Sequence, residues 1–250
     1  MNKHIALAGK GGTGKTTLCA LLVRYLVGRY PGKSILAVDA DANANLNETL
    51  GLEVAETIGT ILEDTKKPGA VPTGMTKDLF VEYRLSRALV ETEAFDLLVM
   101  GNPQGPGCYC YPNDLLKRYL ERLSKGYDFV VVDNEAGLEH LSRKIIPRVD
   151  ILLVTSDASY RGIRSAGRIR QIVSDVGIQV GEMGLVVTRV GEEGIEPLKG
   201  EIEAATLPLR GVIPYDPLIV EYDLQGRPLL ELPEDSEAVK AAARCFQQLF

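Results

Sequence analysis

The sequence predicts an α/β fold in which a doubly wound, mostly parallel sheet carries helices on both faces. Apolar runs recur along the chain, and most are near-continuous rather than alternating, as in strands that are covered on both faces. The runs are Ile5–Ala8, Ile35–Val38, Leu97–Met100, Phe129–Val132, Ile151–Val154, Leu185–Val187 and Val212–Ile213. Helix-like segments lie between them, at Leu18–Tyr30, Leu115–Leu123, Gly162–Val176 and Ser236–Leu249. This alternation is typical of parallel sheets.

A single domain spanning residues 1–250 is the expected organisation, since the chain shows no internal repeat and no Pro/Ser-rich linker. The segment with the weakest pattern is Glu53–Ala94, where Lys66–Gly69 predicts an exposed turn.

Composition indicates a cytoplasmic protein. A hydrophobic content of 45% and a charged content of 25% are ordinary for a soluble domain. The chain has no apolar run of about 20 residues, and its first strand begins too early for a signal peptide, so we expect no membrane partner. A net charge of −6 argues against a nucleic-acid partner, because phosphate backbones select basic surfaces.

The glycine-rich run after the first predicted strand is typical of a phosphate-binding loop. It consists of Gly9, Lys10, Gly11, Gly12, Thr13, Gly14, Lys15, Thr16 and Thr17, and a predicted helix follows it. Glycines let backbone N–H groups turn inward around phosphate oxygens, and the helix N-terminus adds partial positive charge. Lys15 would neutralise the β- and γ-phosphates, and Thr16 would offer a hydroxyl to Mg²⁺. The sequence therefore predicts a P-loop NTPase.

Three acidic residues follow predicted strands at the edge where such sheets bind ligands. Asp39 and Asp41 follow the second strand, and Asp133 closes the apolar run Phe129–Val132 as a Walker B pattern. Thr16, Asp39 and Asp133 are the expected Mg²⁺ site. The alternatives are that Asp133 is a turn residue and that Asp39 or Asp41 only caps the helix that follows.

Lys10, directly after the first glycine, makes the loop resemble the deviant Walker A motif KGG-x-GKT. That family includes MinD, ParA, arsenite-pump ATPases and the nitrogenase iron protein. The resemblance implies a homodimer in which Lys10 reaches the partner's nucleotide and Lys15 contacts its own. It also implies that residues 39–43 and 133–137 are switches I and II, with Asp41 activating the attacking water. Lys10, Lys15 and Asp41 are thus the expected catalytic residues.

Two later segments are similar to the family's nucleotide-base site. Gly184–Arg189 matches the adenine-contacting strand end, and Gly211–Asp216 matches a segment that packs beside the base. Thr188, Arg189 and Pro214 are therefore expected to contact the nucleotide. Many members have Asn where this chain has Thr188, and a single hydroxyl puts side-chain recognition of adenine in doubt.

Cys108 and Cys110 are the candidate metal ligands. They lie in a Gly/Pro-rich loop at about residues 101–112, before a predicted helix that starts near Pro112. Two ligands do not complete a site, but two copies of the pair on a two-fold axis give four thiolates, which suit Zn²⁺ or Ni²⁺. Cys19 and Cys245 lie in predicted helices, and we expect both in the core.

Together with Asp133–Gly137 and Glu139–Arg143, the cysteine pair makes the chain resemble the CooC-type nickel-insertion ATPases. The resemblance implies ATP or ADP with Mg²⁺, and Ni²⁺ (or Zn²⁺) at the dimer interface. It further implies delivery of nickel to carbon monoxide dehydrogenase or acetyl-CoA synthase. One alternative is a MinD/ParA-like positioning ATPase, which the Ala-rich segment Ser236–Phe250 disfavours because it is typical of a packed helix. Another is an iron–sulfur ATPase.

Overall fold

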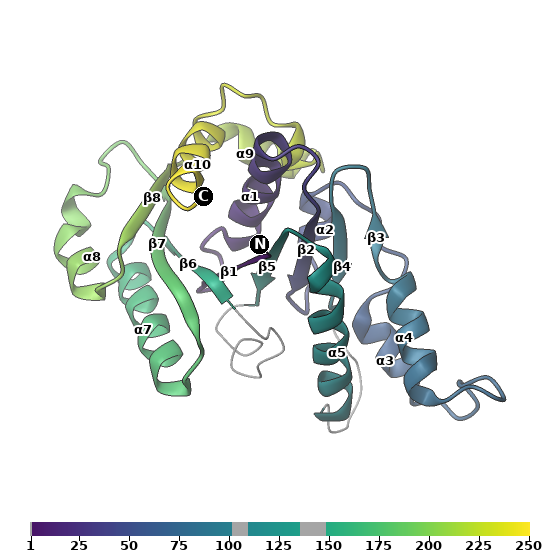
Figure 1. Ribbon diagram of the computed structural model, residues 1–250. Helices are drawn as coiled ribbons and strands as arrows, with labels where there is room; N and C mark the ends of the chain where they lie inside the picture. The colour runs from purple at the N-terminus through teal and green to yellow at the C-terminus, as the bar shows by residue number, and fades with distance from the viewer. Residues whose placement is uncertain (1, 102–109, 136–148) are drawn as a thin grey trace.

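The computed structural model describes residues 2–101, 110–135 and 149–250, and the strands in these ranges form one eight-stranded sheet (Figure 1). The strand order is β3-β4-β2-β5-β1-β6-β7-β8. The strands are β1 (Lys3–Gly9), β2 (Ile35–Ala40), β3 (Val90–Glu91), β4 (Asp96–Val99), β5 (Phe129–Asn134), β6 (Val149–Asp157), β7 (Val180–Val190) and β8 (Leu209–Pro214). All neighbours are parallel except β3 and β4. The predicted doubly wound, mostly parallel sheet is confirmed.

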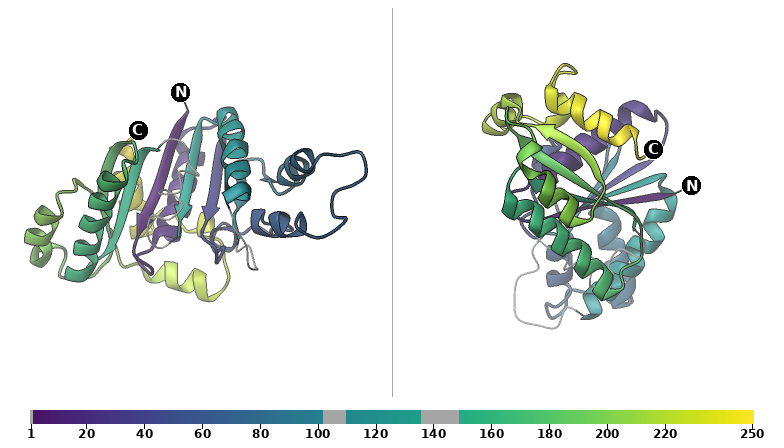
Figure 2. Two further views of the ribbon diagram at one scale, coloured as in Figure 1. Left: turned by 90° about the horizontal axis from the view of Figure 1, so that it is seen from below. Right: turned by 90° about the vertical axis from the view of Figure 1, so that its left-hand side faces the viewer.

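Helices cover both faces of the sheet (Figure 1; Figure 2). One face carries α1 (Lys15–Arg29), α2 (Leu46–Thr49), α9 (Pro217–Leu224) and α10 (Glu237–Gln247). The other carries α3 (Ile58–Asp64), α4 (Lys77–Arg87), α5 (Cys110–Leu123), α7 (Tyr160–Val176) and α8 (Lys199–Ala205). Short 3₁₀ turns are Ser124–Gly126, Glu196–Leu198 and Leu229–Glu231. None of the helices in the described ranges combines the length and apolar composition that a membrane crossing requires.

Burial on both faces explains why the apolar runs are continuous. In β1, Ile5 and Leu7 pack into the core under α1, whereas Ala6 and Ala8 face the core on the side of α7. Successive side chains of a strand point to opposite faces, so a strand between two helical layers needs apolar residues at every position. The C-terminal helix α10 is packed as expected, with Val239 and Phe246 among its buried residues.

The segment with the weakest pattern holds elements that periodicity did not indicate. Helices α3 and α4 lie at the β3–β4 end of the sheet and begin at the capping residues Thr57 and Thr76 (Figure 2). The turn at Lys66–Gly69 is exposed, as predicted. The short elements α2, α8 and α9 were also missed, because four to eight residues span too few turns for a helical period to appear.

Strand register brings the functional segments to one edge of the sheet. Asp39 of β2 pairs in register with Asp133 of β5, and Gly9 of β1 pairs with Thr155 of β6. Because all four strands are parallel, their carboxyl ends open on the same side, where ligands of such sheets bind.

Candidate functional site

The glycine-rich loop joins β1 directly to α1, and two of its glycines are required by their surroundings. Gly14 precedes the helix in the left-handed region, at φ 75° and ψ 27°. At Gly9 the limit is space, since a Cβ there would lie 2.3 Å from the Thr155 hydroxyl oxygen. Only glycine fits both positions without strain or displacement of a neighbour.

Thr13 fixes the middle of this loop. Its backbone N–H and its hydroxyl both donate to the Lys10 carbonyl, at 3.3 Å and 2.8 Å. Its hydroxyl oxygen also lies 2.8 Å from that of Thr155 on β6, and its carbonyl accepts from the Thr188 hydroxyl on β7 at 2.8 Å. The loop is therefore anchored to two neighbouring strands.

The two lysines of the loop differ in their environment. Lys15 is buried, and its Nζ lies 3.5 Å from the Lys10 carbonyl oxygen. The Lys10 side chain is exposed, and its ammonium makes no hydrogen bond or ion pair with the described residues. Lys15 therefore belongs to the interior of the site, whereas Lys10 is available to a group outside the chain.

Asp133 lies beside the first turn of α1. Its Oδ2 accepts a hydrogen bond from the Thr16 hydroxyl at 2.6 Å, whereas its buried Oδ1 has no hydrogen-bond partner among the described residues. Burial raises the pKa of Asp133 to about 7; the Thr16 bond opposes the rise, and nearby Asp39 adds to it. An incompletely satisfied carboxylate next to a hydroxyl is a donor set that suits Mg²⁺.

The Asp39 carboxylate accepts hydrogen bonds from the backbone of the segment that follows it. Its Oδ1 accepts from the Asp41 N–H at 3.0 Å, and its Oδ2 accepts from the Leu46 N–H at the start of α2 at 2.9 Å. Burial nevertheless raises its pKa to about 6, although these hydrogen bonds act in the opposite direction. The hydrogen bond from Leu46 fits the alternative that Asp39 caps the next helix. A role toward Mg²⁺ stays a prediction.

Asp41 is partly exposed and close to the ends of β2 and β5. Its Oδ1 accepts from both the backbone N–H and the side-chain amide of Asn43, at 2.8 Å and 3.0 Å. Unlike Asp39, it does not cap α2 in these contacts. Its carboxylate is therefore held by one neighbouring residue and remains accessible to solvent.

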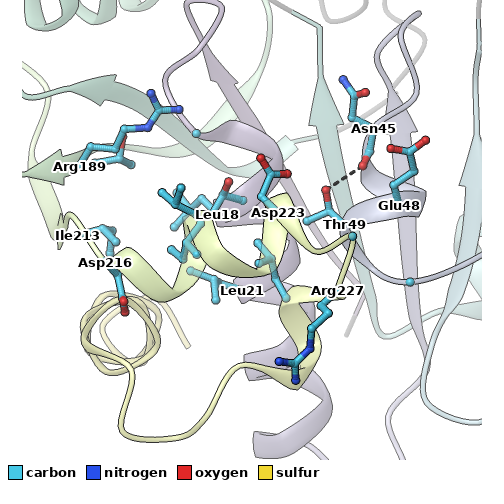
Figure 3. Close-up of a pocket in the computed structure, with 18 of the residues that line it drawn as sticks. Leu18, Leu21, Asn45, Glu48, Thr49, Arg189, Ile213, Asp216, Asp223 and Arg227 are labelled. Carbon is cyan, nitrogen blue, oxygen red and sulfur yellow. Dashed lines mark hydrogen bonds between the residues drawn. The ribbon is translucent and has the colours of Figure 1, made fainter.

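A pocket of about 670 Å³ opens beside the loop, and all three residues predicted to contact the base line it. Figure 3 shows the pocket, with Arg189 labelled among its lining residues. Thr188 and Arg189 contribute the end of β7, and Pro214 the end of β8. Gly14 and Leu18 form the boundary with the glycine loop. The volume lies within the usual range of about 300–1,000 Å³ for small-ligand pockets.

Sequence reasoning missed the remaining walls of this pocket. One comes from α2 and the turn after it, including Glu48 and Gly51, and the other from α9 and the turn after it, including Asp223 and Arg227. Figure 3 labels Glu48, Asp223 and Arg227. A Cβ at Gly51 would lie 2.6 Å from Pro228, so the two walls meet closely there. Glycines at 51 and 226 were the available signal, but nothing in their spacing indicated a ligand.

Asp216 is one of the residues that line the pocket, but its carboxylate is occupied by hydrogen bonds within the protein. Its carboxylate accepts from the Leu218 N–H at the start of α9, and from the Ser236 hydroxyl and Ala238 N–H at the start of α10. Burial alone would raise the pKa of Asp216, but these hydrogen bonds outweigh it and leave the pKa below its ordinary value. Asp216 thus joins two helix N-termini behind the wall that contains Pro214.

The candidate metal ligands are only partly covered by the structure. Cys108 lies outside the described residues. Cys110 is the first residue of α5, which corrects the expectation that the helix starts near Pro112 and that Cys110 lies in the loop. No group of three His, Cys, Asp or Glu side chains within the described ranges could hold a metal ion.

The other two cysteines belong to the core. Cys19 and Cys245 are buried, as predicted. Burial raises the pKa of the Cys19 thiol well above its usual range and that of Cys245 to about 11. Burial in the core thus disfavours the thiolate form of both residues.

Comparison with known proteins agrees with this geometry. A family model described as the CobQ/CobB/MinD/ParA nucleotide binding domain matches residues 5–229. An uncharacterized ATP-binding protein of Methanocaldococcus jannaschii is 44% identical over 239 residues, 94% of each chain. The carbon monoxide dehydrogenase accessory protein CooC of Rhodospirillum rubrum is 31% identical over 238 residues, 89% of this chain and 87% of that protein.

A solved structure shares the fold. The septum site-determining protein MinD of Pyrococcus horikoshii, complexed with Mg-ADP, aligns with a TM-score of 0.74 over 100% of this chain and 96% of its own. Its sequence identity is 23%, so this likeness concerns the fold alone. The family model and the 44% identical relative supply the family: this chain belongs to the CobQ/CobB/MinD/ParA family of nucleotide-binding domains.

Proposed function

We propose that residues 1–250 act as one ATPase unit that binds Mg²⁺–ATP at the glycine loop and hydrolyses it. The observation that carries this proposal is the pairing of Thr16 with Asp133, whose second carboxylate oxygen has no partner among the described residues. Thr16 and Asp133 would hold Mg²⁺, with Asp39 close by in register. The ion would neutralise phosphate charge when bound.

The remaining roles follow from position. Lys15 lies inside the loop and would contact the β- and γ-phosphates, while backbone N–H groups of residues 9–17 bind phosphate oxygens. The base would lie in the 670 Å³ pocket against Thr188, Arg189 and Pro214. Asp41, which is accessible and not used as a helix cap, would orient the attacking water.

Steady-state hydrolysis tests this assignment. Asp41→Asn is expected to lower kcat by at least about 100-fold while the affinity for Mg²⁺–ADP stays within twofold, because Asp41 acts on water and not on the phosphates. Asp235→Asn removes an exposed carboxylate outside the pocket and serves as the matched control. Unchanged turnover in Asp41→Asn would remove Asp41 from the mechanism.

Lys10 supports a nucleotide-dependent homodimer. Its exposed ammonium has no described partner within the chain, as expected of a residue that meets the second subunit. In the slowly hydrolysing Asp41→Asn background, ATP should shift the protein from monomer to dimer in sedimentation velocity. Adding Lys10→Ala should raise the ATP concentration that half-maximal dimerisation requires by at least about tenfold. Lys125→Ala, another exposed lysine, is the control. An unaltered dimer would contradict the role of Lys10.

The cargo we propose is Ni²⁺ (or Zn²⁺), bound by Cys108 and Cys110 from two subunits and delivered to carbon monoxide dehydrogenase or acetyl-CoA synthase. The Cys-x-Cys pair and the similarity to a carbon monoxide dehydrogenase accessory protein support it. Two thiolates from each subunit provide the four soft ligands that such ions prefer.

Anaerobic Ni²⁺ titration with mass determination tests the cargo. We expect one metal per two chains with thiolate-to-nickel absorption, and loss of both in Cys108→Ala/Cys110→Ala. That variant keeps the buried Cys19 and Cys245, so it also reports any binding by the core thiols. Ni²⁺ binding that survives in the variant, or the absence of stoichiometric Ni²⁺ binding by the wild-type protein, would contradict the proposed cargo. A MinD/ParA-like positioning role would then be tested with liposomes, DNA and protein partners.

A further inference from the structure

Thr188 lies at the carboxyl end of β7, where the pocket meets the glycine loop. We propose that Thr188 is a positioning residue that orients the phosphate-binding backbone through the carbonyl of Thr13, and that it does not recognise the base by donating a hydrogen bond. This inference rests on the proposed nucleotide function and gives the Thr188 hydroxyl a role toward the phosphates, while the residue still lines the pocket proposed for the base.

The contacts of the Thr188 hydroxyl show how its proton is used. The oxygen lies 2.8 Å from the Thr13 carbonyl oxygen and 3.2 Å from the Ser156 carbonyl oxygen, and the residue is only 5% exposed. Both neighbours are acceptors, and a hydroxyl has one proton to donate. The proton therefore points to protein carbonyls, of which Thr13 is the nearer, and is not free for a ring nitrogen of the base.

This hydrogen bond determines the direction of an amide in the loop. The Thr13 carbonyl and the Gly14 N–H belong to the same trans peptide plane, so they point in opposite directions. Fixing the carbonyl toward β7 turns the Gly14 N–H away from β7. Gly14 also begins the helix turn in the left-handed region, and a Cβ there would lie 3.6 Å from the Thr188 hydroxyl oxygen.

A second anchor holds the other side of the same residue. The Thr13 hydroxyl oxygen lies 2.8 Å from that of Thr155, so β6 holds the side chain while β7 holds the carbonyl. Thr13 and Thr155 are buried, and β6 and β7 are hydrogen-bonded neighbours. The amides are thus set in direction before any ligand binds, and this preorganisation lowers the ordering cost of binding phosphate.

The inference predicts a signature that depends on phosphate and not on the base. Thr188→Val keeps the branched shape but leaves the Thr13 carbonyl without its donor, whereas Thr188→Ser keeps the hydroxyl. Loss of one neutral hydrogen bond corresponds to about a three- to tenfold change in affinity. The same factor should apply to ADP, to GDP and to tripolyphosphate, which has no base.

The experiment is calorimetric titration of wild type, Thr188→Val and Thr188→Ser with Mg²⁺–ADP, Mg²⁺–GDP and magnesium tripolyphosphate. We expect Thr188→Val to weaken all three about equally, with the ADP-to-GDP affinity ratio unchanged within twofold, and Thr188→Ser to restore the wild-type values. Thr155→Val removes the other anchor and should give the same pattern. It replaces Thr188→Val if thermal unfolding shows that the latter is not folded.

Two results would overturn the inference. One is a loss confined to ADP with tripolyphosphate unaffected, which would make Thr188 a reader of the base. The other is wild-type affinity of Thr188→Val for all three ligands. Failure of the wild-type protein to bind Mg²⁺–ADP would instead refute the proposed function, so the two failures are separate observations.

Discussion

Asp133 and Asp216, at opposite ends of the site, are both buried carboxylates, yet their pKa values shift in opposite directions. Asp133 is 1% exposed and its pKa rises to about 7, while Asp216 is 6% exposed and its pKa falls. Burial acts on both in the same sense, because a poorly solvated charge is unfavourable. The two carboxylates differ in how deeply they are buried, in their charged neighbours and in their hydrogen-bond donors.

The number of hydrogen-bond donors is one part of this contrast. Asp216 receives hydrogen bonds from Leu218, Ser236 and Ala238, whereas Asp133 receives one from Thr16 and keeps one oxygen without a partner among the described residues. A carboxylate whose charge the protein satisfies contributes to the fold. One whose charge is left incomplete is suited to bind a cation, in line with the Mg²⁺ role proposed for Asp133.

The largest expected effect is on stability at the base end. Asp216→Ala removes the acceptor for two helix N-termini and leaves buried N–H groups unpaired, so the free energy of unfolding should fall by about 3–4 kcal/mol. Urea unfolding of the nucleotide-free protein at pH 7 measures it, with exposed Asp235→Ala as control. A loss similar to that of Asp235→Ala would contradict the structural role.

The pH dependence of Asp216→Asn sharpens the same point. Because the folded pKa of Asp216 lies below its ordinary value of 3.8, the charged form stabilises the native state above that pH, and this stabilisation is lost as the pH falls through the folded pKa. Asp216→Asn should therefore be about 2 kcal/mol less stable than wild type at pH 7, with the gap narrowing below about pH 4. A gap that is constant between pH 3 and 7 would show that the charge is irrelevant.

Asp133→Asn should change the free energy of unfolding in the opposite direction from Asp216→Asn. It removes a buried charge that one donor satisfies, so the free energy of unfolding without nucleotide and Mg²⁺ should rise by about 1 kcal/mol at pH 8. In the same protein, Mg²⁺ should no longer strengthen ADP binding. Urea unfolding in EDTA and calorimetry with and without Mg²⁺ measure the two effects. If the variant were less stable than wild type and Mg²⁺ still strengthened its ADP binding, Asp133 would be a structural residue like Asp216.

For Ser236→Ala we expect a change as small as that for Asp133→Asn, but in the destabilising direction. Ser236 caps α10 through the Val239 N–H and donates to Asp216, but the two backbone donors to Asp216 remain in the variant. The free energy of unfolding should fall by about 1 kcal/mol, and the Asp216→Ala/Ser236→Ala double variant should lose less than the sum of the singles. Additive losses would show that the two residues act separately.

The sequence predicted what is local or periodic. The buried strands appeared as apolar runs, and the glycine loop and Asp133 appeared as motifs directly after strands. The two helical walls of the pocket were not predicted, because α2 and α9 are short and only the fold brings Gly51, after α2, close to Pro228, after α9. Asp216 matched a motif, but its structural role depends on Ser236, 20 residues away, which only the fold brings near.

Thr188 and Asp39 show a second kind of limit. Both residues were expected at the site, but a residue type does not reveal which group its hydroxyl donates to or its carboxylate accepts from. Thr188 donates to the loop and Asp39 accepts from α2, and both choices depend on where backbone groups of distant segments end up. Roles of this kind follow from packing and not from spacing.

The short strand β3 has a consequence for how the folded protein meets other copies of itself. It adds only Val90 and Glu91 to the sheet, in the antiparallel sense, and it forms one end of the strand order. A two-residue border exposes few open backbone groups, and Glu91 places a charge there. Strands from another molecule therefore find little template at this border of the folded sheet, which lowers the risk of edge-to-edge aggregation.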